Sequence, residues 1–228
     1  MTTTQDTDTD ALAPGRAGHR VRSSWQRPHA QVLDEFRQLS VPSISDAQFG
    51  HGVMHCGIHA MVPFRAPLVG GALTVSITPG NGKMIRRAIE LAQPGDVLVV
   101  NGHGTGERAV LGGNVLMSAA AAGIVAVVVD GAVRDLDDAE RLGIGLAARA
   151  VCPRSGTDER GVGEVGYVTA VGGVAVAAGD IVVIDQDGIV VVSAGDAADV
   201  AAGATEVQQR KGSAADFDER WRRMQSNK

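Results

Sequence analysis

Apolar residues recur along the chain in two patterns, one typical of helices and one typical of strands. After Pro28 the segment HAQVLDEFRQL carries apolar residues at helical spacing, and residues 83–92 repeat that period. Runs of β-branched and apolar residues cover 68–77, 96–100 and 124–129, and the last two are of the kind buried on both faces of a sheet. Strands that alternate with helices predict a βαβ arrangement and therefore an α/β fold class.

Shorter elements are predicted around these strands. Residues 43–49 are expected to form a short helix with Ser43 as its N-cap. An alanine-rich helix is expected over 114–122, where Gly123 ends it, and a further short helix over 136–142. These helices follow the predicted strands closely, as the connections of a βαβ unit do.

Beyond these helices the chain becomes rich in strands. Glycine turns separate predicted strands at 146–152, 164–171 and 174–177. The sequence DIVVIDQDGIVVV predicts a β-hairpin with residues 185–188 at its tip. Two helical stretches are expected from residue 196 onward, the last of them DFDERWRRM.

Length and composition favour one globular domain with an extension at each end. The chain has 228 residues, of which 44% are hydrophobic and 21% charged, so it is long enough to bury one core. We expect a disordered leader over 1–27, a single domain over 28–195 and a helical tail over 196–228.

Charge and the absence of targeting signals in the sequence argue against several classes of protein. The formal net charge of -5 argues against a general nucleic-acid binder, because such proteins neutralise phosphates with clustered Lys and Arg. An anionic substrate must therefore be captured by a few local positive groups. The chain shows neither a membrane-length apolar run nor a secretory signal, and Cys56 and Cys152 are expected as free thiols, so we predict a cytoplasmic protein.

The strongest candidate for chemistry combines a glycine-rich helix start with the residues after a buried strand. The sequence GGNV at 112–115 begins the alanine-rich helix, and predicted loops at 101–107 and 130–135 follow two strands, where α/β sheets bind ligands. A helix N-terminus binds anions, Arg134 can hold a carboxylate with two hydrogen bonds, and Asp135 can ligate Mg2+. Alternatively, the glycines form a plain turn and the Arg134 and Asp135 side chains a surface ion pair, and spacing alone leaves both interpretations open.

A long segment around these residues resembles a known family. The run GGNVLMSAAAAGIVAVVVDGAVRD at 112–135 is similar to the RraA-like family, which contains the regulator of ribonuclease activity A and the 4-hydroxy-4-methyl-2-oxoglutarate aldolases. Supporting matches are VPSISDA at 41–47, GGALTV at 70–75, PGDVLVV at 94–100 and GDIVVIDQDGIVVV at 179–192.

The resemblance implies a fold, an assembly and roles for individual residues. It implies a β/β/α sandwich of the swivelling-domain type, assembled as homotrimers or homohexamers with sites at subunit interfaces. Arg134 would bind the pyruvyl carboxylate and stabilise an enolate, and Asp135 would ligate Mg2+ or Mn2+. The substrate-binding backbone would come from Gly112, Gly113, Asn114 and Val115.

The implied activity is that of a metal-dependent (class II) carbon–carbon lyase. Such an enzyme would cleave a small oxo acid, 4-hydroxy-4-methyl-2-oxoglutarate or 4-carboxy-4-hydroxy-2-oxoadipate, and decarboxylate oxaloacetate, releasing pyruvate. A non-catalytic regulator that binds a ribonuclease is the alternative from another class. A different metal-assisted reaction on a related acid is a third.

One position departs from the family pattern. The aldolases carry Asp or Glu at the position of Gly113, where the acid serves proton transfer, whereas this chain has glycine. His103 or Glu107 in the loop before the helix could replace that acid, although each is more simply a solvent-facing residue. Because decarboxylation needs no proton removal from a hydroxyl, we hypothesise that it tolerates Gly113 better than aldol cleavage does.

Two further groups suggest metal sites but have simpler explanations. His51, His55 and His59 are spaced by four with Cys56 nearby, which on a helix would suit zinc, but the intervening glycines argue against a helix. The DQDG sequence at 185–188 is similar to part of a calcium loop, but the distal Glu of such a loop is missing and the hairpin turn is the simpler explanation.

Two other segments are interpreted structurally. Gly80-Asn81-Gly82 is expected to form a turn before the helix at 83, with a minor binding role implied by the resemblance. Arg220, Arg222 and Arg223 are expected on a solvated helix face.

Overall fold

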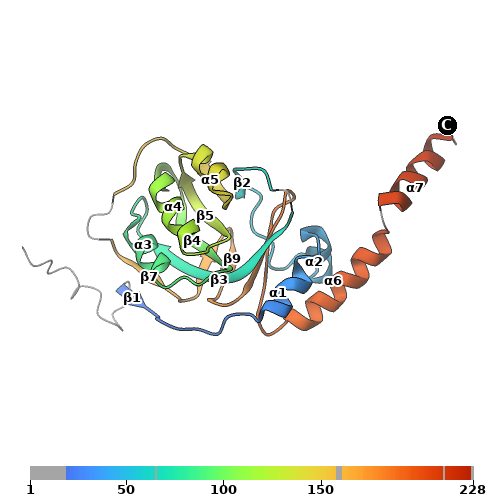
Figure 1. Cartoon of the computed structure of the whole chain (residues 1–228), viewed down its shortest axis with the longest axis horizontal. Coiled ribbons are helices and arrows are strands. Elements are labelled where there is room, and N and C mark those ends of the chain that lie inside the picture. Colours follow the sequence, from blue (N-terminus) through green and yellow to red (C-terminus); the bar gives the residue numbers. More distant parts are fainter. Residues whose placement is uncertain (1–18, 65, 158–160, 213, 227–228) are drawn as a thin grey trace, which may run out of the picture.

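A nine-stranded mixed sheet forms the centre of the molecule (Figure 1). The computed structural model describes residues 19–64, 66–157, 161–212 and 214–226. Four strands pair in parallel in chain order: β3 (Leu68–Ile77), β4 (Asp96–Leu111), β5 (Ala126–Val133) and β6 (Gly145–Val151). This parallel core places the carboxyl ends of β4 and β5 side by side.

Shorter strands extend the sheet at both edges. The sheet continues beyond β3 through β7 (Gly163–Val165) and β1 (His19–Val21), and beyond β6 through β2 (His59–Ala60). The hairpin of β10 (Ile181–Ile184) and β11 (Ile189–Val192) joins it through β3, and β8 (Thr169–Val171) pairs separately with β9 (Val174–Val176). The predicted hairpin is confirmed, whereas the single strand expected over 164–171 is two strands in different sheets.

Helices cover one face of the parallel core and strands cover the other. Helices α3 (Lys83–Ile89), α4 (Gly113–Ala121) and α5 (Leu136–Leu142) lie on the first face. Along β4, Leu98 and Val100 face this helical core, while Val97 and Val99 pack with residues of β10 and β11 on the opposite side. Both faces are buried, as the apolar run indicates, and the expected β/β/α layering is confirmed.

A third core lies between the β10–β11 hairpin and three further helices. These are α1 (Ala30–Phe36), α2 (Val41–Ala47) and α6 (Ala197–Lys211), with Phe36 and Ile44 fully buried among them. The N-cap of α2 is Ser40, whose hydroxyl accepts the Ser43 amide at 3.3 Å, and not Ser43 as expected. The helix begins earlier because Ser40 has the extended backbone of a cap.

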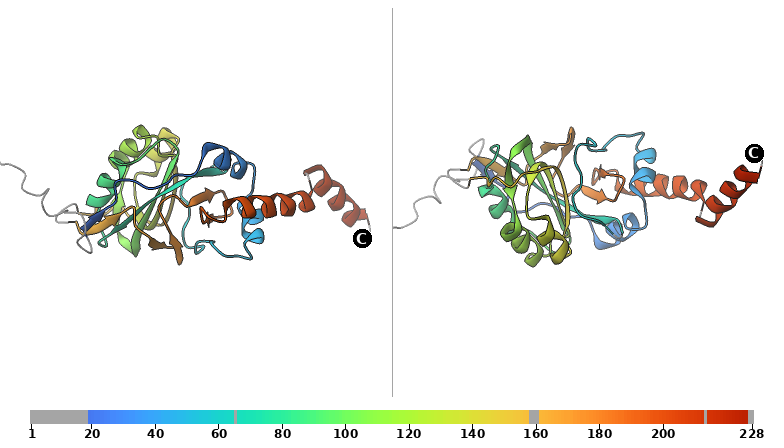
Figure 2. Two further views of the ribbon diagram at one scale, coloured as in Figure 1. Left: turned by 90° about the horizontal axis from the view of Figure 1, so that it is seen from below. Right: turned by 90° about the horizontal axis from the view of Figure 1, so that it is seen from above.

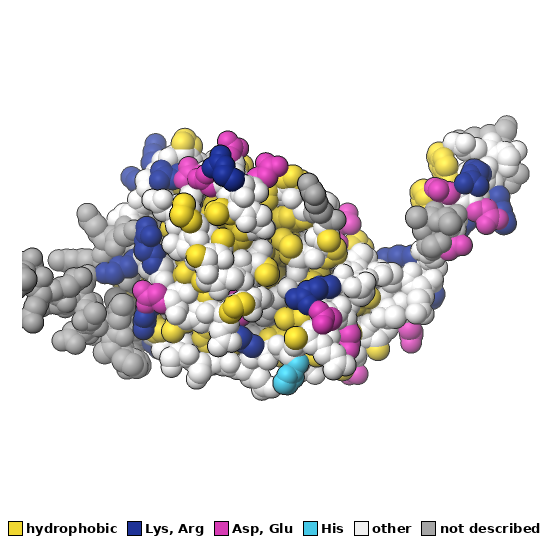
Figure 3. Space-filling view, viewed as in Figure 1, with side chains coloured by type: hydrophobic (Ala, Val, Ile, Leu, Met, Phe, Trp, Pro, Cys, Tyr) yellow, Lys and Arg dark blue, Asp and Glu magenta, His cyan; other side chains and the backbone are white. Residues whose placement is uncertain are grey.

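The last helix extends away from the layered body. Helix α7 (Ala214–Ser226) follows α6 after Gly212 and stands apart from the sheet in both views of Figure 2. Its exposed side chains include Phe217, Trp221 and Met224, and Figure 3 shows apolar and charged groups together on it. The two expected helical stretches are present, and no helix in the described ranges is long and apolar enough to cross a membrane.

Three predicted boundaries need correction. Strand β1 pairs with β7, and Arg27 Nε donates to Asp96 Oδ1 at 2.8 Å, so ordered structure begins before residue 28, whereas residues 1–18 of the expected leader lie outside the described residues. The expected loop at 101–107 belongs to β4, whose register with β5 shifts repeatedly after Asn101. Strand β5 also continues to Val133, because its glycine and apolar residues keep pairing with β4 and β6.

Candidate functional site

Strand register brings together two segments that are 22 residues apart in the sequence. Leu111 at the end of β4 pairs with Val133 at the end of β5, and the Arg134 amide donates to the Leu111 carbonyl at 3.2 Å. Gly112 therefore lies beside Arg134. Helix α4 begins directly after Gly112, so its N-terminus faces the Arg134–Asp135 turn.

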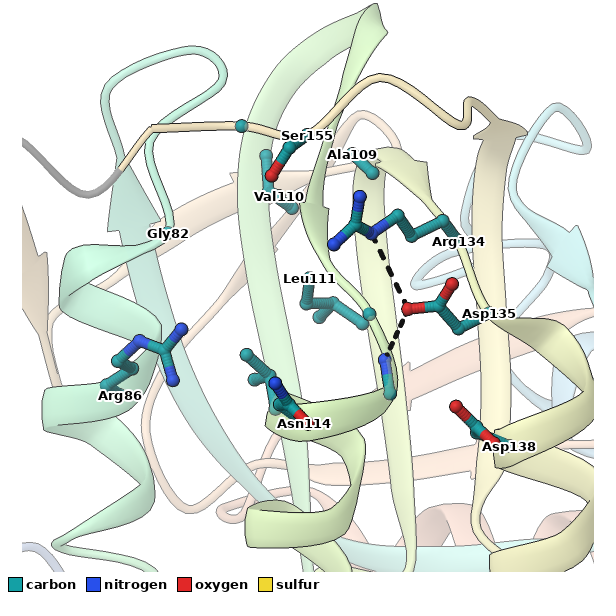
Figure 4. A pocket seen from close by; sticks show the side chains of 14 residues that line it. Gly82, Arg86, Ala109, Val110, Leu111, Asn114, Arg134, Asp135, Asp138 and Ser155 are labelled. Carbon is teal, nitrogen blue, oxygen red and sulfur yellow. Dashed lines mark hydrogen bonds and ion pairs between the residues drawn. The ribbon is translucent and has the colours of Figure 1, made fainter.

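These segments line one cavity of about 230 Å³ (Figure 4). All of the sequence-predicted site residues lie on its wall: Gly112, Gly113, Asn114, Val115, Arg134 and Asp135. The volume is below the roughly 300–1,000 Å³ of pockets for drug-sized ligands, so the cavity has the size for a small ligand.

The turn after β5 directs the Asp135 carboxylate onto the start of α4. Asp135 has a left-handed backbone, with φ of 61°, and its Oδ2 accepts the Gly113 amide at 2.8 Å. A Cβ on Gly112 would lie 2.4 Å from that Oδ2 and 2.9 Å from Arg134 Cγ. A side chain at Gly112 would therefore displace the Asp135 carboxylate and the Arg134 side chain from their positions beside the helix start.

Arg134 keeps most of its hydrogen-bonding capacity. Its Nε lies 3.5 Å from Asp135 Oδ2, its Nη1 donates to the Pro153 carbonyl at 3.4 Å, and its side chain is 39% exposed. Both contacts are long compared with charge-assisted hydrogen bonds of about 2.8 Å. The guanidinium therefore has donors to offer to a carboxylate.

The first turn of α4 leaves one of its amides for a ligand. The Gly113 amide is taken by Asp135, and the Val115 amide donates to the Gly112 carbonyl at 2.9 Å. Within the described part of the chain, no acceptor binds the Asn114 amide. The expectation that Val115 offers its amide is therefore wrong, since the turn itself uses that group, although Val115 still lines the cavity.

Two charged residues of the cavity wall were not predicted from the sequence. Arg86 on α3 faces the cavity from the side opposite Arg134, and Asp138 on α5 lies next to Asp135 (Figure 4). Helical spacing carries a signal for Asp138, because a residue three positions after Asp135 returns to the same side of the helix. Arg86 has no such local signal, since its position depends on how α3 packs beside α4.

The acidic groups of the cavity suit a hard cation. The Asp135 Oδ1 accepts no hydrogen bond from the described residues, and the Asp138 carboxylate is close by. Mg2+ is commonly held by one or two carboxylates with water completing its shell, which this donor set fits. The described residues contain no group of three or more His, Cys, Asp or Glu placed to hold a metal, so a protein cage is not formed.

Asp130, the other aspartate of the DGAVRD sequence, makes contacts that stabilise the fold. Asp130 is 11% exposed; its Oδ1 accepts Arg149 Nε at 2.6 Å and its Oδ2 accepts the Gly172 amide at 2.9 Å. The hydrogen bond to Asp130 raises the pKa of Arg149 above its usual value, against the opposing effect of burial. This pair ties β5 to β6 and to the turn after β8.

Neither residue suggested as a substitute for the family acid reaches the cavity. His103 and Glu107 are exposed on the irregular part of β4 and do not line it. Within one chain the geometry gives this hypothesis no support, because the register shifts carry this part of β4 away from the cavity.

The remaining candidates lie outside the site or at its edge. His55 Nδ1 accepts the Gly57 amide at 2.9 Å in a turn, and no helix aligns the three histidines. The 185–188 segment forms the hairpin turn, closed by an Asp185 amide hydrogen bond to the Gly188 carbonyl. Of the 80–82 turn, only Gly82 lines the cavity. The other groups are as follows: Arg220, Arg222 and Arg223 are exposed on α7, and Cys56 and Cys152 are free thiols.

Comparison with known proteins finds that most of the chain is similar to one family. The family model described as RraA-like, Aldolase/RraA, matches residues 41–191. A protein of Halalkalibacterium halodurans, provisionally named a 4-hydroxy-4-methyl-2-oxoglutarate aldolase, is 31% identical over 195 residues, which cover 86% of this chain and 89% of that protein.

Two further proteins carry the two kinds of name found among the matches, aldolase and ribonuclease inhibitor. The 4-hydroxy-4-methyl-2-oxoglutarate aldolase of Thermus thermophilus is 38% identical over 125 residues, covering 55% of this chain and 75% of the relative. The crystal structure of Streptomyces coelicolor RraAS2, described as an unusual member of the RNase ES inhibitor RraA protein family, superposes with a TM-score of 0.74. It has 25% identity and covers 82% of this chain and 97% of that one.

Proposed function

Because the chain belongs to the Aldolase/RraA family, we propose that it is a divalent-metal-dependent lyase that cleaves a carbon–carbon bond of a small oxo acid and releases pyruvate. The observation that carries this proposal is the convergence of Arg134, the N-terminus of α4 and Asp135 on one small cavity. We propose 4-hydroxy-4-methyl-2-oxoglutarate as the first substrate, because relatives are named as aldolases of this compound, and oxaloacetate as the second.

Arg134 and the start of α4 bind the substrate's carboxylate in this proposal. The guanidinium can donate two parallel hydrogen bonds to it, and the Asn114 amide at the positive end of the helix adds a third. As the carbon–carbon bond breaks, negative charge develops on the 2-oxo oxygen, and the same fixed donors stabilise it. Gly112 allows the substrate to approach the backbone closely.

Asp135, with Asp138 beside it, would hold the Mg2+ or Mn2+ ion. When bound, the ion supplies a Lewis acid that makes the oxo acid a better electron sink. The Gly113 amide fixes the Asp135 carboxylate at 2.8 Å, so this side chain is oriented before any ligand arrives. Such preorganisation avoids the cost of ordering the group during binding.

The proposal also includes an assembly and a location. We infer a homotrimer or homohexamer in the cytoplasm, with the substrate's second half contacted by a neighbouring subunit. Sedimentation of the purified protein measures the assembly, and a monomer would contradict this part of the proposal.

The test is pyruvate release from 4-hydroxy-4-methyl-2-oxoglutarate and from oxaloacetate, with Mg2+ or with a chelator. We expect metal-dependent release that Arg134→Ala lowers about 100-fold or more, the usual cost of removing a donor to a developing oxyanion. Arg37→Ala is the matched control, because Arg37 has the same 39% exposure and lies remote from the cavity on the surface beside α1.

Absence of release from both substrates would overturn the lyase proposal. Recovery of a ribonuclease with the purified protein in that case would favour the binding role described for the RraA relatives. Equal activity with metal and with chelator would contradict the metal dependence alone.

A further inference from the structure

Arg86 brings a second arginine to the wall of the cavity. It lies on α3, and Figure 4 shows its guanidinium directed into the cavity from the side opposite Arg134. Apart from Arg134, it is the only cationic side chain among the described residues of that wall. An arginine carries five N–H donors, so a contact within the protein leaves others for a ligand.

The charges of the wall suit a ligand with two negative charges. Arg86 and Arg134 balance the carboxylates of Asp135 and Asp138, so the described part of the wall carries no net charge by itself. A divalent ion held by Asp135, as proposed above, adds two positive charges. Since opposite charges attract more strongly in a partly enclosed site than in bulk water, the loaded cavity is complementary to a dianion.

The positions of the two arginines suit the two ends of one substrate. In the proposed function, Arg134 and the Asn114 amide bind the carboxylate next to the 2-oxo group. Arg86 lies across the cavity from this place, on a different element. The remaining described residues of the wall between them are uncharged, so Arg86 is the cation that faces the rest of a bound substrate.

We propose that Arg86 binds the carboxylate at the far end of the substrate and so selects dicarboxylic over monocarboxylic 2-oxo acids. This inference rests on the proposed function and names the substrate class of the same site. Both proposed substrates have such a group, 4-hydroxy-4-methyl-2-oxoglutarate at C5 and oxaloacetate at C4. Arg86 holds this carboxylate from within the same chain, while the neighbouring subunit of the proposed assembly contacts the remaining groups of that half.

The two substrates differ in what happens to the far carboxylate. In aldol cleavage it keeps its charge through the transition state, so Arg86 stabilises bound substrate and transition state equally and affects KM but not kcat. In oxaloacetate, C4 leaves as CO2, the C3–C4 electron pair moves into the pyruvate enolate, and water protonates C3. The charge departs from C4 in this reaction, so Arg86 stabilises the bound substrate more than the transition state.

The first experiment measures binding of two 2-oxo acids that differ only at the far end. 2-Oxoglutarate ends in a carboxylate and 2-oxopentanoate in a methyl group, and neither has the C4 hydroxyl that aldol cleavage needs. In calorimetric titrations with Mg2+, we expect the native protein to bind 2-oxoglutarate at least about tenfold more tightly, as one charge-assisted contact provides. Arg86→Met, which removes the charge but keeps an unbranched side chain, should bind the two acids equally within about twofold.

Arg87→Met is the matched control. Arg87 is the next residue of the same helix, is exposed like Arg86 and does not line the cavity, and its guanidinium pairs with Glu90. This variant should keep the native preference for 2-oxoglutarate. Arg86→Lys retains the charge without the planar fork and should keep a preference of about threefold or more. Equal binding of both acids by the native protein, or a full preference in Arg86→Met, would overturn the inference.

The second experiment measures steady-state rates of Arg86→Met on both substrates. We expect KM for 4-hydroxy-4-methyl-2-oxoglutarate to rise about tenfold or more, with kcat within about threefold of the native value. For oxaloacetate, KM should rise while kcat stays the same or increases. A fall in kcat on both substrates would contradict the inference, because it would indicate a disturbed site. If the native protein released pyruvate from neither substrate, yet lost its preference for 2-oxoglutarate through Arg86→Met, the lyase proposal alone would be overturned.

Discussion

Two aspartate–arginine pairs, one with its aspartate within β5 and one just past the end of that strand, show how a closed and an open ion pair differ. Asp130 within the strand is 11% exposed, and Arg149 Nε approaches it to 2.6 Å. Asp135 just past the strand end is 42% exposed, and Arg134 Nε stays at 3.5 Å. The first pair uses its groups on each other and on Gly172. The second is held by one amide and keeps donors and acceptors for a ligand.

The difference follows from where each pair lies along the strand. Asp130 is flanked by β4 and β6, so its carboxylate needs protein partners to replace water. Arg134 and Asp135 lie where the strand has ended and the chain turns into α5. Both side chains are partly open to solvent there, so the same two residue types keep groups that a ligand could use.

The largest effect, on the free energy of unfolding, should come from breaking the Asp130–Arg149 pair. We expect Asp130→Ala to lower the free energy of unfolding by about 3 kcal/mol, because Arg149 and the Gly172 amide lose their acceptor. Urea denaturation measures this loss, with the exposed Asp34→Ala as control at less than about 0.5 kcal/mol. A loss as small as that of the control would remove the distinction between the two pairs.

An intermediate effect, on metal affinity, should come from changing Asp135 in the solvent-exposed Arg134–Asp135 pair. Asp135→Asn is expected to weaken Mn2+ binding about 10- to 100-fold, since an amide replaces the charged oxygen. Its unfolding free energy should stay within about 0.5 kcal/mol of the native value. Titration calorimetry tests the affinity, and Asp187→Asn at the hairpin tip provides a control acid. Unchanged affinity would mean that Asp135 is not a metal ligand.

The smallest effect, on KM, should come from replacing Arg134 by lysine, which separates the contribution of the charge from that of the planar guanidinium. Arg134→Lys keeps the charge but loses the two parallel donors, so we expect KM for oxaloacetate to rise about tenfold. Stability should be unchanged, whereas Arg149→Lys should cost about 1 kcal/mol and leave KM alone. If both lysine variants altered the same quantity, the assignment of one pair to structure and the other to binding would fail.

One apolar strand and one short helix were the most predictable elements of the fold. The strand over 68–77 and the helix over 136–142 have the expected bounds, because their patterns suit one secondary structure only. The three-residue β1 was not predictable, since its stability comes from pairing with β7. The irregular end of β4 was also missed, because glycines that suggest a loop are tolerated here while β4 keeps pairing with β5.

The sequence by itself determined the α/β class, the family and the residues 112–115, 134 and 135 that line the cavity. It could do so because apolar period and local motifs are properties of neighbouring residues. Only the tertiary structure placed Asp138 over Gly113, set Arg86 opposite Arg134 and closed Asp130 against Arg149. Those contacts join residues on different elements, and strand register and helix packing decide them.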